Sequence, residues 1–363
     1  MMLDRAKIQI SEQGNKGGEM QNEQVNFVVP NRAWFSLTGI CNNSCKWCYR
    51  SGSEIPVFLD TSFIFQAART LVQSGVKHCS LYGGEPTLHK DYRAIVKLLI
   101  RDDLFSSCAF ITNGRLLSFF VPDEWSGNKK IRVTVSLHGA NQDQYRSNTG
   151  SENGFDETVR AIENLKREGV KHSVNVVVSK ENLNTMADFI GVVSALSVEM
   201  LGFTFALPSL DDPNYESDPY VLSDAVGRIN SLCLSYEQKH CFVYSLPWCT
   251  LEERFLENLL LNKQLMFNCP VNEGKVVVIK ENGALALCTH LSGMELLTER
   301  ETKKVLLSSK SFLKFWNSLS MREVRQSVDV HRHPKCVACK YRYYCKGGCP
   351  IWWGVNDFQK TLN

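Results

Sequence analysis

The sequence predicts an α/β fold, in which a partial barrel of six strand–helix units is followed by a small cysteine-rich domain. Short apolar stretches alternate with helix-like stretches as far as Leu207, and from Cys269 onward cysteines become frequent. Strands in series with helices argue for parallel strands joined by right-handed crossovers. Six units are too few for a closed eight-unit barrel, so we expect an open barrel with its chemistry on the loops after the strands.

Each expected element rests on an apolar pattern of strand or helix length. The expected strands are 34–37, 79–82, 109–112, 131–137, 174–178 and 203–207. The expected helices between and after them are 61–74, 92–100, 155–169, 183–196, 220–239 and 251–265. The predicted domains are an N-terminal tail (1–30), the partial barrel (31–210), a helical bridge (211–265) and the cysteine-rich domain (266–363).

Composition excludes some classes of protein. The chain has 363 residues, of which 44% are hydrophobic, and 41 basic residues nearly balance 38 acidic ones. A net charge of +3 predicts neither a nucleic-acid partner nor a membrane-surface partner. The first 25 residues contain no signal-peptide core, and no apolar run is long enough to span a bilayer. We therefore expect a cytoplasmic protein.

Fourteen cysteines are many for a protein of a reducing compartment, where clustered cysteines are more often metal ligands than disulfides. Nine of them fall into patterned groups. The remaining five, which we expect to be mostly small buried hydrophobic side chains, are Cys79, Cys108, Cys233, Cys241 and Cys249.

The first cysteine group is Cys41-Asn-Asn-Ser-Cys45-Lys-Trp-Cys48, directly after the first expected strand. One curled loop with these gaps can deliver three thiolates to a 4Fe–4S cluster. The next cysteine is Cys79, inside an expected strand, so one iron would lack a protein ligand and a small molecule could chelate it. The alternative is a zinc site, although zinc sites favour paired C-x-x-C units that supply four ligands.

A second motif, Gly83-Gly84-Glu85-Pro86, follows the second expected strand. Its glycines would let the backbone approach a ligand closely, and Glu85 can accept hydrogen bonds from an ammonium group. Alone, the motif is typical of a turn. Its place one strand–helix unit after the cysteine loop favours a ligand site.

Together these motifs resemble the radical S-adenosylmethionine (SAM) superfamily, from about Trp34 to Leu207. The resemblance implies that three cysteines ligate the cluster, namely Cys41, Cys45 and Cys48. It implies a set of residues at the SAM pocket, with Trp47 at the adenine, four residues at the amino group, and Ser136 at the ribose or carboxylate. The other members of this set are Gly83, Gly84, Glu85, Pro86 and Asn113. His138 stands where peptide-modifying relatives more often have Asp, and we expect a structural role for it rather than proton donation.

The C-terminal cysteines resemble the SPASM domain, which binds auxiliary iron–sulfur clusters. The resemblance assigns Cys269, Cys288 and Cys349 to a first auxiliary cluster, and Cys336, Cys339 and Cys345 to a second. The family's last cysteine is absent, so the second cluster lacks its usual fourth ligand and the first can also have an open iron. Cys249, Asp357, water or substrate are the alternatives for these positions, and a zinc ribbon over residues 336–349 is the alternative to iron.

The resemblance implies an enzyme that reductively cleaves SAM to a 5′-deoxyadenosyl radical, which then abstracts a substrate hydrogen. We expect oxidative modification of a peptide, such as a cross-link, with one or two auxiliary 4Fe–4S clusters. Radical oxidation or epimerisation of a small molecule, such as an aminoglycoside-type sugar, is the alternative. A non-catalytic iron–sulfur sensor or scaffold is a minor one. The expected partners are the substrate, a one-electron reductant such as flavodoxin or ferredoxin, and a separate peptide-recognition protein.

Overall fold

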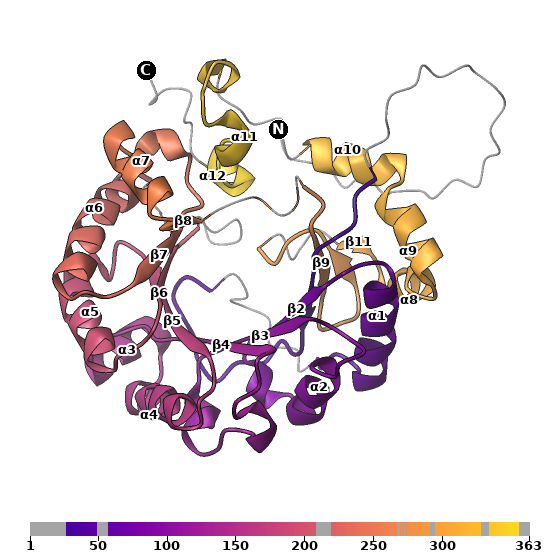
Figure 1. The fold of residues 1–363 in the computed structure, drawn as a ribbon, viewed down its shortest axis with the longest axis horizontal. Helices are drawn as coiled ribbons and strands as arrows, with labels where there is room; N and C mark the ends of the chain where they lie inside the picture. Colours follow the sequence, from indigo (N-terminus) through magenta and orange to yellow (C-terminus); the bar gives the residue numbers. More distant parts are fainter. Residues whose placement is uncertain are drawn as a thin grey trace.

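One sheet runs through the part of the chain that the structure describes (Figure 1). The structure is a computed structural model, and it describes residues 27–48, 57–207, 219–266, 269, 271, 273–290, 295–327 and 334–355. The strand order in the sheet is β11-β10-β9-β1-β2-β3-β4-β5-β6-β7-β8. The sheet curves around an interior, with helices on its outer side (Figure 1).

The six strands of the barrel lie side by side in chain order and are all parallel. They are β1 (Arg32–Ser36), β2 (His78–Tyr82), β3 (Ser107–Thr112), β4 (Ile131–Ser136), β5 (His172–Val178) and β6 (Leu201–Phe205). The predicted strands are confirmed to within two residues at each end, and so is the predicted parallel α/β class. Parallel pairing brings the carboxyl ends of these strands, and the loops that follow them, to one edge of the sheet.

The outer helices follow their strands as predicted. The barrel helices are α1 (Thr61–Gln73), α2 (Tyr92–Leu99), α4 (Gly154–Arg167) and α5 (Met186–Ala195). In α1, the side chain of Asp60 accepts a hydrogen bond from the backbone N–H of Phe63 at 2.7 Å, which caps the helix. Its buried face then includes Ile64, Ala68 and Leu71. Short 3-10 turns also occur: η1 (Pro86–Leu88), η2 (Arg115–Ser118), η3 (Asp123–Trp125), η4 (Leu183–Thr185), η5 (Trp248–Thr250) and η6 (Pro334–Val337).

One barrel helix, α3 (Gln142–Thr149), was not predicted from the sequence. Its eight residues contain a single large apolar side chain, Tyr145, so the apolar stripe that marks a helix is missing. The residues that start and end the helix are the ones typical of helix caps. Asn141 caps the first turn by accepting from Gln144 N, and Gly150 ends the helix in the left-handed conformation.

The segment predicted as a helical bridge contains both helices and strands. Its helices are α6 (Pro219–Ser235) and α7 (Glu253–Leu261), and its strands β7 (His240–Val243) and β8 (Leu265–Met266) extend the parallel sheet beyond β6. The expected helices 220–239 and 251–265 are therefore too long at their ends. Glu237 and Lys263 adopt positive φ after each helix, which stops the helical path before the strand begins.

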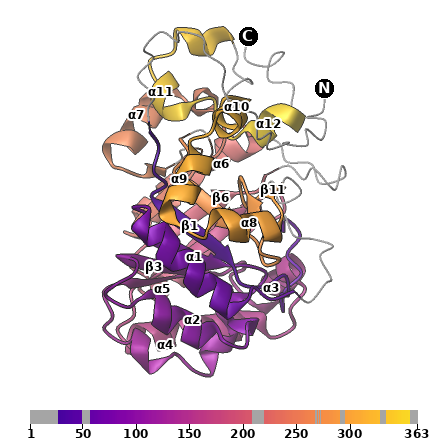
Figure 2. The same ribbon diagram turned by 90° about the vertical axis from the view of Figure 1, so that its right-hand side faces the viewer.

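The cysteine-rich segment extends the sheet on its other side. β9 (Val276–Ile279) pairs in parallel with β1, and β10 (Leu285–Ala286) and β11 (Glu295–Leu297) continue in antiparallel pairing. The remaining helices are α8 (Glu299–Val305), α9 (Ser309–Trp316), α10 (Leu319–Ser327), α11 (Arg342–Cys345) and α12 (Pro350–Val355). Figure 2 shows α11 and α12 at the end of the molecule away from α2 and α4.

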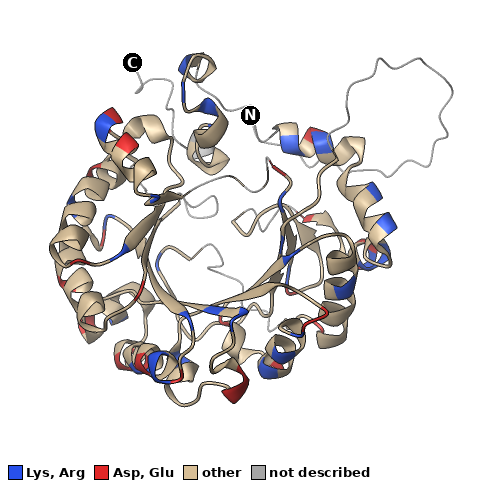
Figure 3. Cartoon of the chain, in the orientation of Figure 1, with Lys and Arg blue, Asp and Glu red and all other residues tan. Residues whose placement is uncertain are grey.

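Alternation along the strands sets the two faces of the sheet. Residues such as Phe35, Leu81 and Phe110 are buried in the main core under the helices. Charged residues of both signs are spread over the outer helices (Figure 3). Among the described residues, no helix combines the length and apolarity that a membrane crossing needs.

Candidate functional site

The three predicted cluster cysteines lie on the loop that leaves the carboxyl end of β1. Cys41 is exposed, and Cys45 and Cys48 are half-buried. The N–H of Cys48 donates to the carbonyl of Cys45 at 3.0 Å, so the loop turns back between these two thiols. Although the residue is exposed as a whole, partial desolvation of its thiol raises the pKa of Cys41 to about 11, and the charges of Glu85 and Cys48 contribute. The pKa of Cys45 is also raised, by burial first and then by the charges of Cys48 and Cys41. The three thiols are therefore close enough to interact electrostatically.

The segment that begins with α3 holds the cysteine loop along its length. The N–H of Ser44 donates to the carbonyl of Thr149 at 2.7 Å, and the N–H of Lys46 donates to that of Asn148 at 3.1 Å. The amide of Asn43 donates to the hydroxyl of Tyr145 at 3.1 Å. The short polar helix therefore acts as the anchor of the loop.

Gly83 and Gly84 lie against the chain just before the first cysteine. A Cβ on Gly84 would be 2.2 Å from the carbonyl oxygen of Ile40, and one on Gly83 would be 2.6 Å from that of Thr38. The N–H of Gly84 donates to Thr38 O at 2.8 Å, and the N–H of Glu85 donates to Ile40 O at 2.7 Å. We expected these glycines to admit a ligand. The close neighbour that the structure shows is the protein's own cysteine loop.

Replacing Gly84 by Ala should therefore loosen the cysteine loop. Because the new methyl group would meet backbone rather than a flexible side chain, we expect a loss of about 1–3 kcal/mol in the free energy of unfolding, and reduced iron retention. Gly227→Ala is the matched control, since its Cβ would meet nothing within 4 Å. Denaturant unfolding and iron analysis of both variants check this. Equal behaviour of the two variants would contradict the close packing at Gly84.

Glu85 is 1% exposed and joins the loops after β2 and β3. Its Oε1 accepts from Thr87 N at 3.1 Å, from Thr87 Oγ1 at 2.5 Å and from Thr112 Oγ1 at 2.6 Å. Its Oε2 accepts from Asn113 N at 2.7 Å. Burial raises the pKa of Glu85, and these hydrogen bonds oppose the rise. The carboxylate therefore connects the Gly83–Pro86 motif with the loop after β3. The oxygen that can still accept a further hydrogen bond is Oε2.

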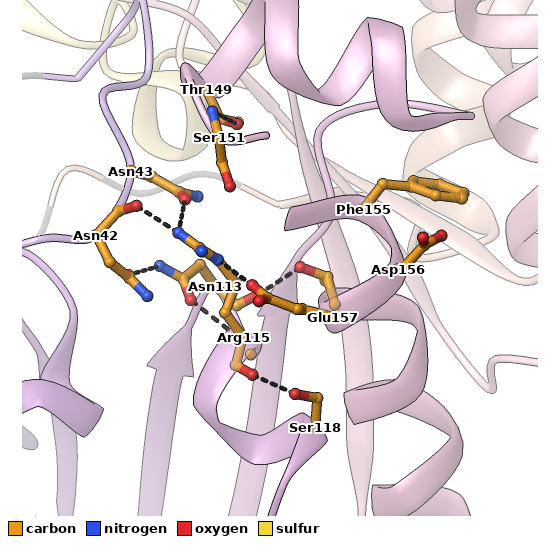
Figure 4. A network of polar contacts seen from close by, with 12 residues as sticks. Asn42, Asn43, Asn113, Arg115, Ser118, Thr149, Ser151, Phe155, Asp156 and Glu157 are labelled. Carbon is orange, nitrogen blue, oxygen red and sulfur yellow. Dashed lines mark hydrogen bonds and ion pairs between the residues drawn. The ribbon is translucent and has the colours of Figure 1, made fainter. Parts of the chain in front are cut away.

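Asn113 and Arg115 carry the connection on to the cysteine loop (Figure 4). The amide of Asn113 donates to Asn42 Oδ1 at 2.7 Å and lies 4.0 Å from Cys41 Sγ. The guanidinium of Arg115 donates to the carbonyl of Asn42 and to Asn43 Oδ1, and its Nε pairs with Glu157 of α4. Arg115 therefore fixes the first turn of the loop against the outer helix.

Replacing Arg115 by Ala should destabilise the cysteine loop more than the loss of a surface pair would. The side chains of Arg115 and Glu157 are only 18% and 15% exposed, so the change leaves one partly buried carboxylate and one carbonyl without a donor. We expect a loss of about 1–3 kcal/mol in unfolding free energy. Arg146→Ala is the control, since its pair with Glu152 is 59% and 71% exposed, and it should cost below about 1 kcal/mol. Thermal unfolding compares them, and equal losses would refute the anchoring role.

The other predicted SAM-pocket residues lie at the same edge of the sheet. Trp47 packs edge-on against His138, with ring centroids 5.1 Å apart. His138 is 5% exposed, burial lowers its pKa to about 4, and its Nδ1 has no hydrogen-bond partner. Ser136 ends β4 in register with Asn175, and Pro86 opens the buried turn η1. The imidazole beside Trp47 is therefore held in its neutral form by burial.

The C-terminal cysteines form two groups. Burial raises the pKa of Cys349, and the charges of Cys288 and Cys269 raise it as well. The pKa of Cys345 is raised by burial and by the charge of Cys336, while the N–H of Cys339 donates to Cys336 O at 3.3 Å. The two sets that the SPASM resemblance implies remain a prediction, and the neighbours named here belong to one set in each case.

Among the described residues, no three Cys, His, Asp or Glu side chains are gathered tightly enough to hold one metal ion. A single zinc ion holds thiolate sulfur at about 2.3 Å. A 4Fe–4S cluster is larger than one ion, so its ligands stand farther apart.

Several residues of the site carried no signal in the sequence analysis. Arg115, Asn42 and Tyr145 act through contacts between segments that are far apart in the chain. The only available signal was position, since Asn42 lies inside the cysteine motif and Arg115 follows Thr112-Asn113-Gly114.

Residues 35–193 match the model of the radical SAM superfamily. Among curated relatives, a probable GTP 3′,8-cyclase of Metallosphaera sedula is 31% identical over 150 residues, which cover 40% of this chain and 46% of the relative. The antilisterial bacteriocin subtilosin biosynthesis protein AlbA of Bacillus subtilis is 27% identical over 209 residues, which cover 56% of this chain and 46% of AlbA. The chain thus spans about half the length of these relatives.

The fold is similar to that of SuiB from Streptococcus suis. The structure of SuiB bound to its precursor peptide SuiA has a TM-score of 0.67 at 15% identity, covering 95% of this chain and 81% of SuiB. The structure bound to S-adenosylmethionine has a TM-score of 0.64 at 16% identity, covering 89% and 73%. At this identity the likeness concerns the fold, and it extends over the cysteine-rich segment as well as the barrel.

Proposed function

We propose that this chain, which belongs to the radical SAM superfamily, is an enzyme that reductively cleaves SAM and removes a hydrogen atom from a peptide substrate. The observation that carries the proposal is the meeting of three motifs at the carboxyl ends of β1, β2 and β3. Glu85 binds Asn113, and the amide of Asn113 reaches Asn42 beside Cys41. These contacts hold the cysteine loop after β1 and the Gly83–Pro86 motif after β2 together as one unit.

The residues fit the cluster that the family implies. One loop offers three thiols, and two N–H groups point at Cys41 Sγ, from Asn43 N at 3.4 Å and Asn113 Nδ2 at 4.0 Å. Donors of this kind stabilise thiolate sulfur in iron–sulfur sites. When bound, the 4Fe–4S cluster would supply the electron that cleaves SAM.

The chain's own residues would bind and orient SAM. Glu85 Oε2 would accept from the ammonium group, as a charge-assisted hydrogen bond in a buried place. Trp47 would flank the adenine, and Ser136 would reach the ribose or carboxylate from the end of β4. Gly83 and Pro86 would keep the loop in place around Glu85, while His138 Nδ1 offers one further polar contact.

The interior of the barrel supplies a polar setting for the substrate. On the strand face opposite the helix-packed core, Ser36 Oγ donates to Glu281 Oε2 at 2.9 Å, and Thr204 Oγ1 donates to Asn175 Oδ1 at 3.0 Å. Such groups can bind a peptide backbone as well as a polar small molecule. They do not by themselves select the substrate class.

Two comparisons support a peptide. SuiB, which was solved with the precursor peptide SuiA bound, is similar in fold over 95% of this chain, and AlbA is named for bacteriocin biosynthesis. We propose an oxidative modification such as a cross-link, with electrons passed through auxiliary clusters at the two C-terminal cysteine groups. A one-electron reductant of the flavodoxin or ferredoxin class and a separate peptide-recognition protein would be the partners.

A small-molecule substrate is the second candidate. It is favoured by the relative from M. sedula, named as a GTP cyclase, but that match covers 40% of this chain. A non-catalytic sensor is disfavoured because it would not need a SAM pocket.

The test is reductive cleavage of SAM by anaerobically reconstituted protein. We expect 5′-deoxyadenosine and methionine under strong reductant without substrate, and more of both with the true substrate. With a deuterated peptide, deuterium should appear in 5′-deoxyadenosine. A properly reconstituted protein that forms no 5′-deoxyadenosine would refute the enzyme proposal. Cleavage of SAM that is stimulated only by small molecules would refute a peptide as the substrate.

A further inference from the structure

We infer that Cys249 is the fourth protein ligand of the second auxiliary cluster, beside Cys336, Cys339 and Cys345. The inference rests on the proposed function, since it takes the C-terminal cysteines as cluster ligands. By spacing, the second group contains three cysteines, and a 4Fe–4S cluster can take four protein ligands. A fourth ligand can come from another part of the fold, and Asp357, the other protein candidate, lies outside the described residues.

Cys349 is not available to the second group. Its electrostatic neighbours are Cys288 and Cys269, which belong to the first group. The N–H of Cys349 donates to the carbonyl of Ser245 at 2.7 Å, and this bond fixes the start of α12 on the segment after β7. Both groups therefore draw on residues 345–349, but Cys345 belongs to the second group and Cys349 to the first.

The segment that carries Cys249 is held tightly against the second group. The N–H of Trp248 donates to Cys345 Sγ at 3.3 Å, and Trp352 Nε1 donates to Ser245 Oγ at 3.2 Å. Gly348 has φ +77°, and a Cβ there would be 2.7 Å from Ser245 O. Only glycine admits this approach, so the contact between residues 245–248 and the cysteine turn is built into the fold.

Cys249 is the next residue after Trp248, so its Cα lies about 3.8 Å from that of Trp248. The cysteines whose charges act on its thiol are Cys345, Cys336 and Cys339, and Tyr244 is a further neighbour. These three cysteines are the members of the second group. The contact comes from a loop almost ninety residues upstream, which explains why the spacing pattern does not include it.

The other isolated cysteines differ from Cys249. Cys79, Cys108 and Cys233 are buried in the main core, as expected for small apolar side chains, and Cys241 is half-buried on β7. Cys249 is exposed, and it lies in η5, on the segment that follows the carboxyl end of β7. A structural role in packing therefore accounts for four of the five, and it does not account for Cys249.

The surroundings suit an anionic cluster with four thiolates. The turn after Cys345 has positive φ values at Lys346, Gly347 and Gly348. Burial raises the pKa of the Cys345 thiol, and the backbone N–H groups of Trp248, Gly347 and Gly348 oppose the rise, as donors to a thiolate would. Trp248 adds an N–H to sulfur, of the kind that tunes cluster potential. A cluster with four protein ligands has no open iron, which fits electron transfer. The first group, with three cysteines, is the one left with an open position.

The test uses the full chain carrying Cys41→Ala, Cys45→Ala and Cys48→Ala, so that only auxiliary clusters can hold iron. Cys249→Ala, Cys336→Ala and Cys241→Ala are each added to it. Iron, sulfide and zinc are measured after anaerobic reconstitution, with EPR spectra of the reduced and oxidised protein. We expect Cys249→Ala and Cys336→Ala each to lower iron by up to about four atoms per chain, or to produce a three-iron signal. Cys241→Ala should match its parent.

A conservative variant guards against a general loss of folding. Cys249→Ser offers an oxygen ligand, so we expect it to retain more iron than Cys249→Ala and to change the EPR spectrum or reduction potential of one cluster. Cys249 variants that match Cys241→Ala in iron and spectra would overturn the inference. So would zinc in place of iron, or equal iron loss in Cys241→Ala. Failure of the native chain to cleave SAM would refute the proposed function separately, because the iron comparison does not depend on cleavage.

Discussion

Replacing Cys41, Cys45 or Cys48 by Ala should abolish 5′-deoxyadenosine formation from SAM. The three thiols lie on one loop that is bonded at its centre to Thr149 and Asn148. A cluster left with two protein ligands should be lost from the site. We expect a fall of at least about a thousandfold in cleavage, which corresponds to about 4 kcal/mol in barrier height.

Replacing Cys336 or Cys345 by Ala should behave differently. These residues lie in the C-terminal segment, away from the loop after β1, so uncoupled SAM cleavage should persist while substrate turnover fails. Chromatography of 5′-deoxyadenosine for each variant, with iron content measured in parallel, separates the two sets. Full cleavage activity in a Cys48→Ala protein would contradict the assignment of the first cluster.

The sequence was sufficient to predict the barrel because each of its units is local. A buried strand such as β3 and an amphipathic helix such as α4 each carry a complete signal within a few residues. The positions of the motifs followed from this, since parallel strands place the loops after β1, β2 and β3 at one edge. Cys41, Glu85 and Asn113 were grouped through the resemblance of their motifs to the radical SAM superfamily, and the parallel strands explain why these motifs meet.

What could not be predicted depends on contacts between distant segments. The run Val276–Ile279 is apolar enough to be a strand, but nothing local says that it pairs in parallel with β1, some 240 residues earlier. Gly84 was predicted to approach a ligand, and the structure shows the backbone of Ile40 as its close neighbour. Cys249 has no cysteine close to it in the sequence, and only the packing of Gly348 on Ser245 brings it to the C-terminal group.

Replacing Glu85 by Ala should both destabilise the fold and weaken SAM binding. The variant leaves four buried donors without their acceptor, namely the N–H groups of Thr87 and Asn113 and the hydroxyls of Thr87 and Thr112. Each unpaired donor costs about 1–3 kcal/mol, so we expect a total loss of at least about 4 kcal/mol in unfolding free energy. Loss of the charge-assisted contact to the SAM ammonium should lower affinity by about tenfold or more.

Two further variants separate the scaffold role of Glu85 from its role toward SAM. Thr112→Val removes one donor to Oε1 and leaves Oε2 in place, so it should lower stability with little change in SAM affinity. Glu85→Gln keeps the size but loses the charge, and its amide nitrogen would face the N–H of Asn113 if its oxygen keeps the bonds to Thr87 and Thr112. It should therefore lose SAM affinity as well as stability. Denaturant unfolding and equilibrium binding of SAM to reconstituted protein measure the two effects. If SAM affinity falls in parallel with stability in all three variants, including Thr112→Val, Glu85 affects SAM binding only through the fold. The proposed contact between Glu85 and the SAM ammonium group would then be wrong.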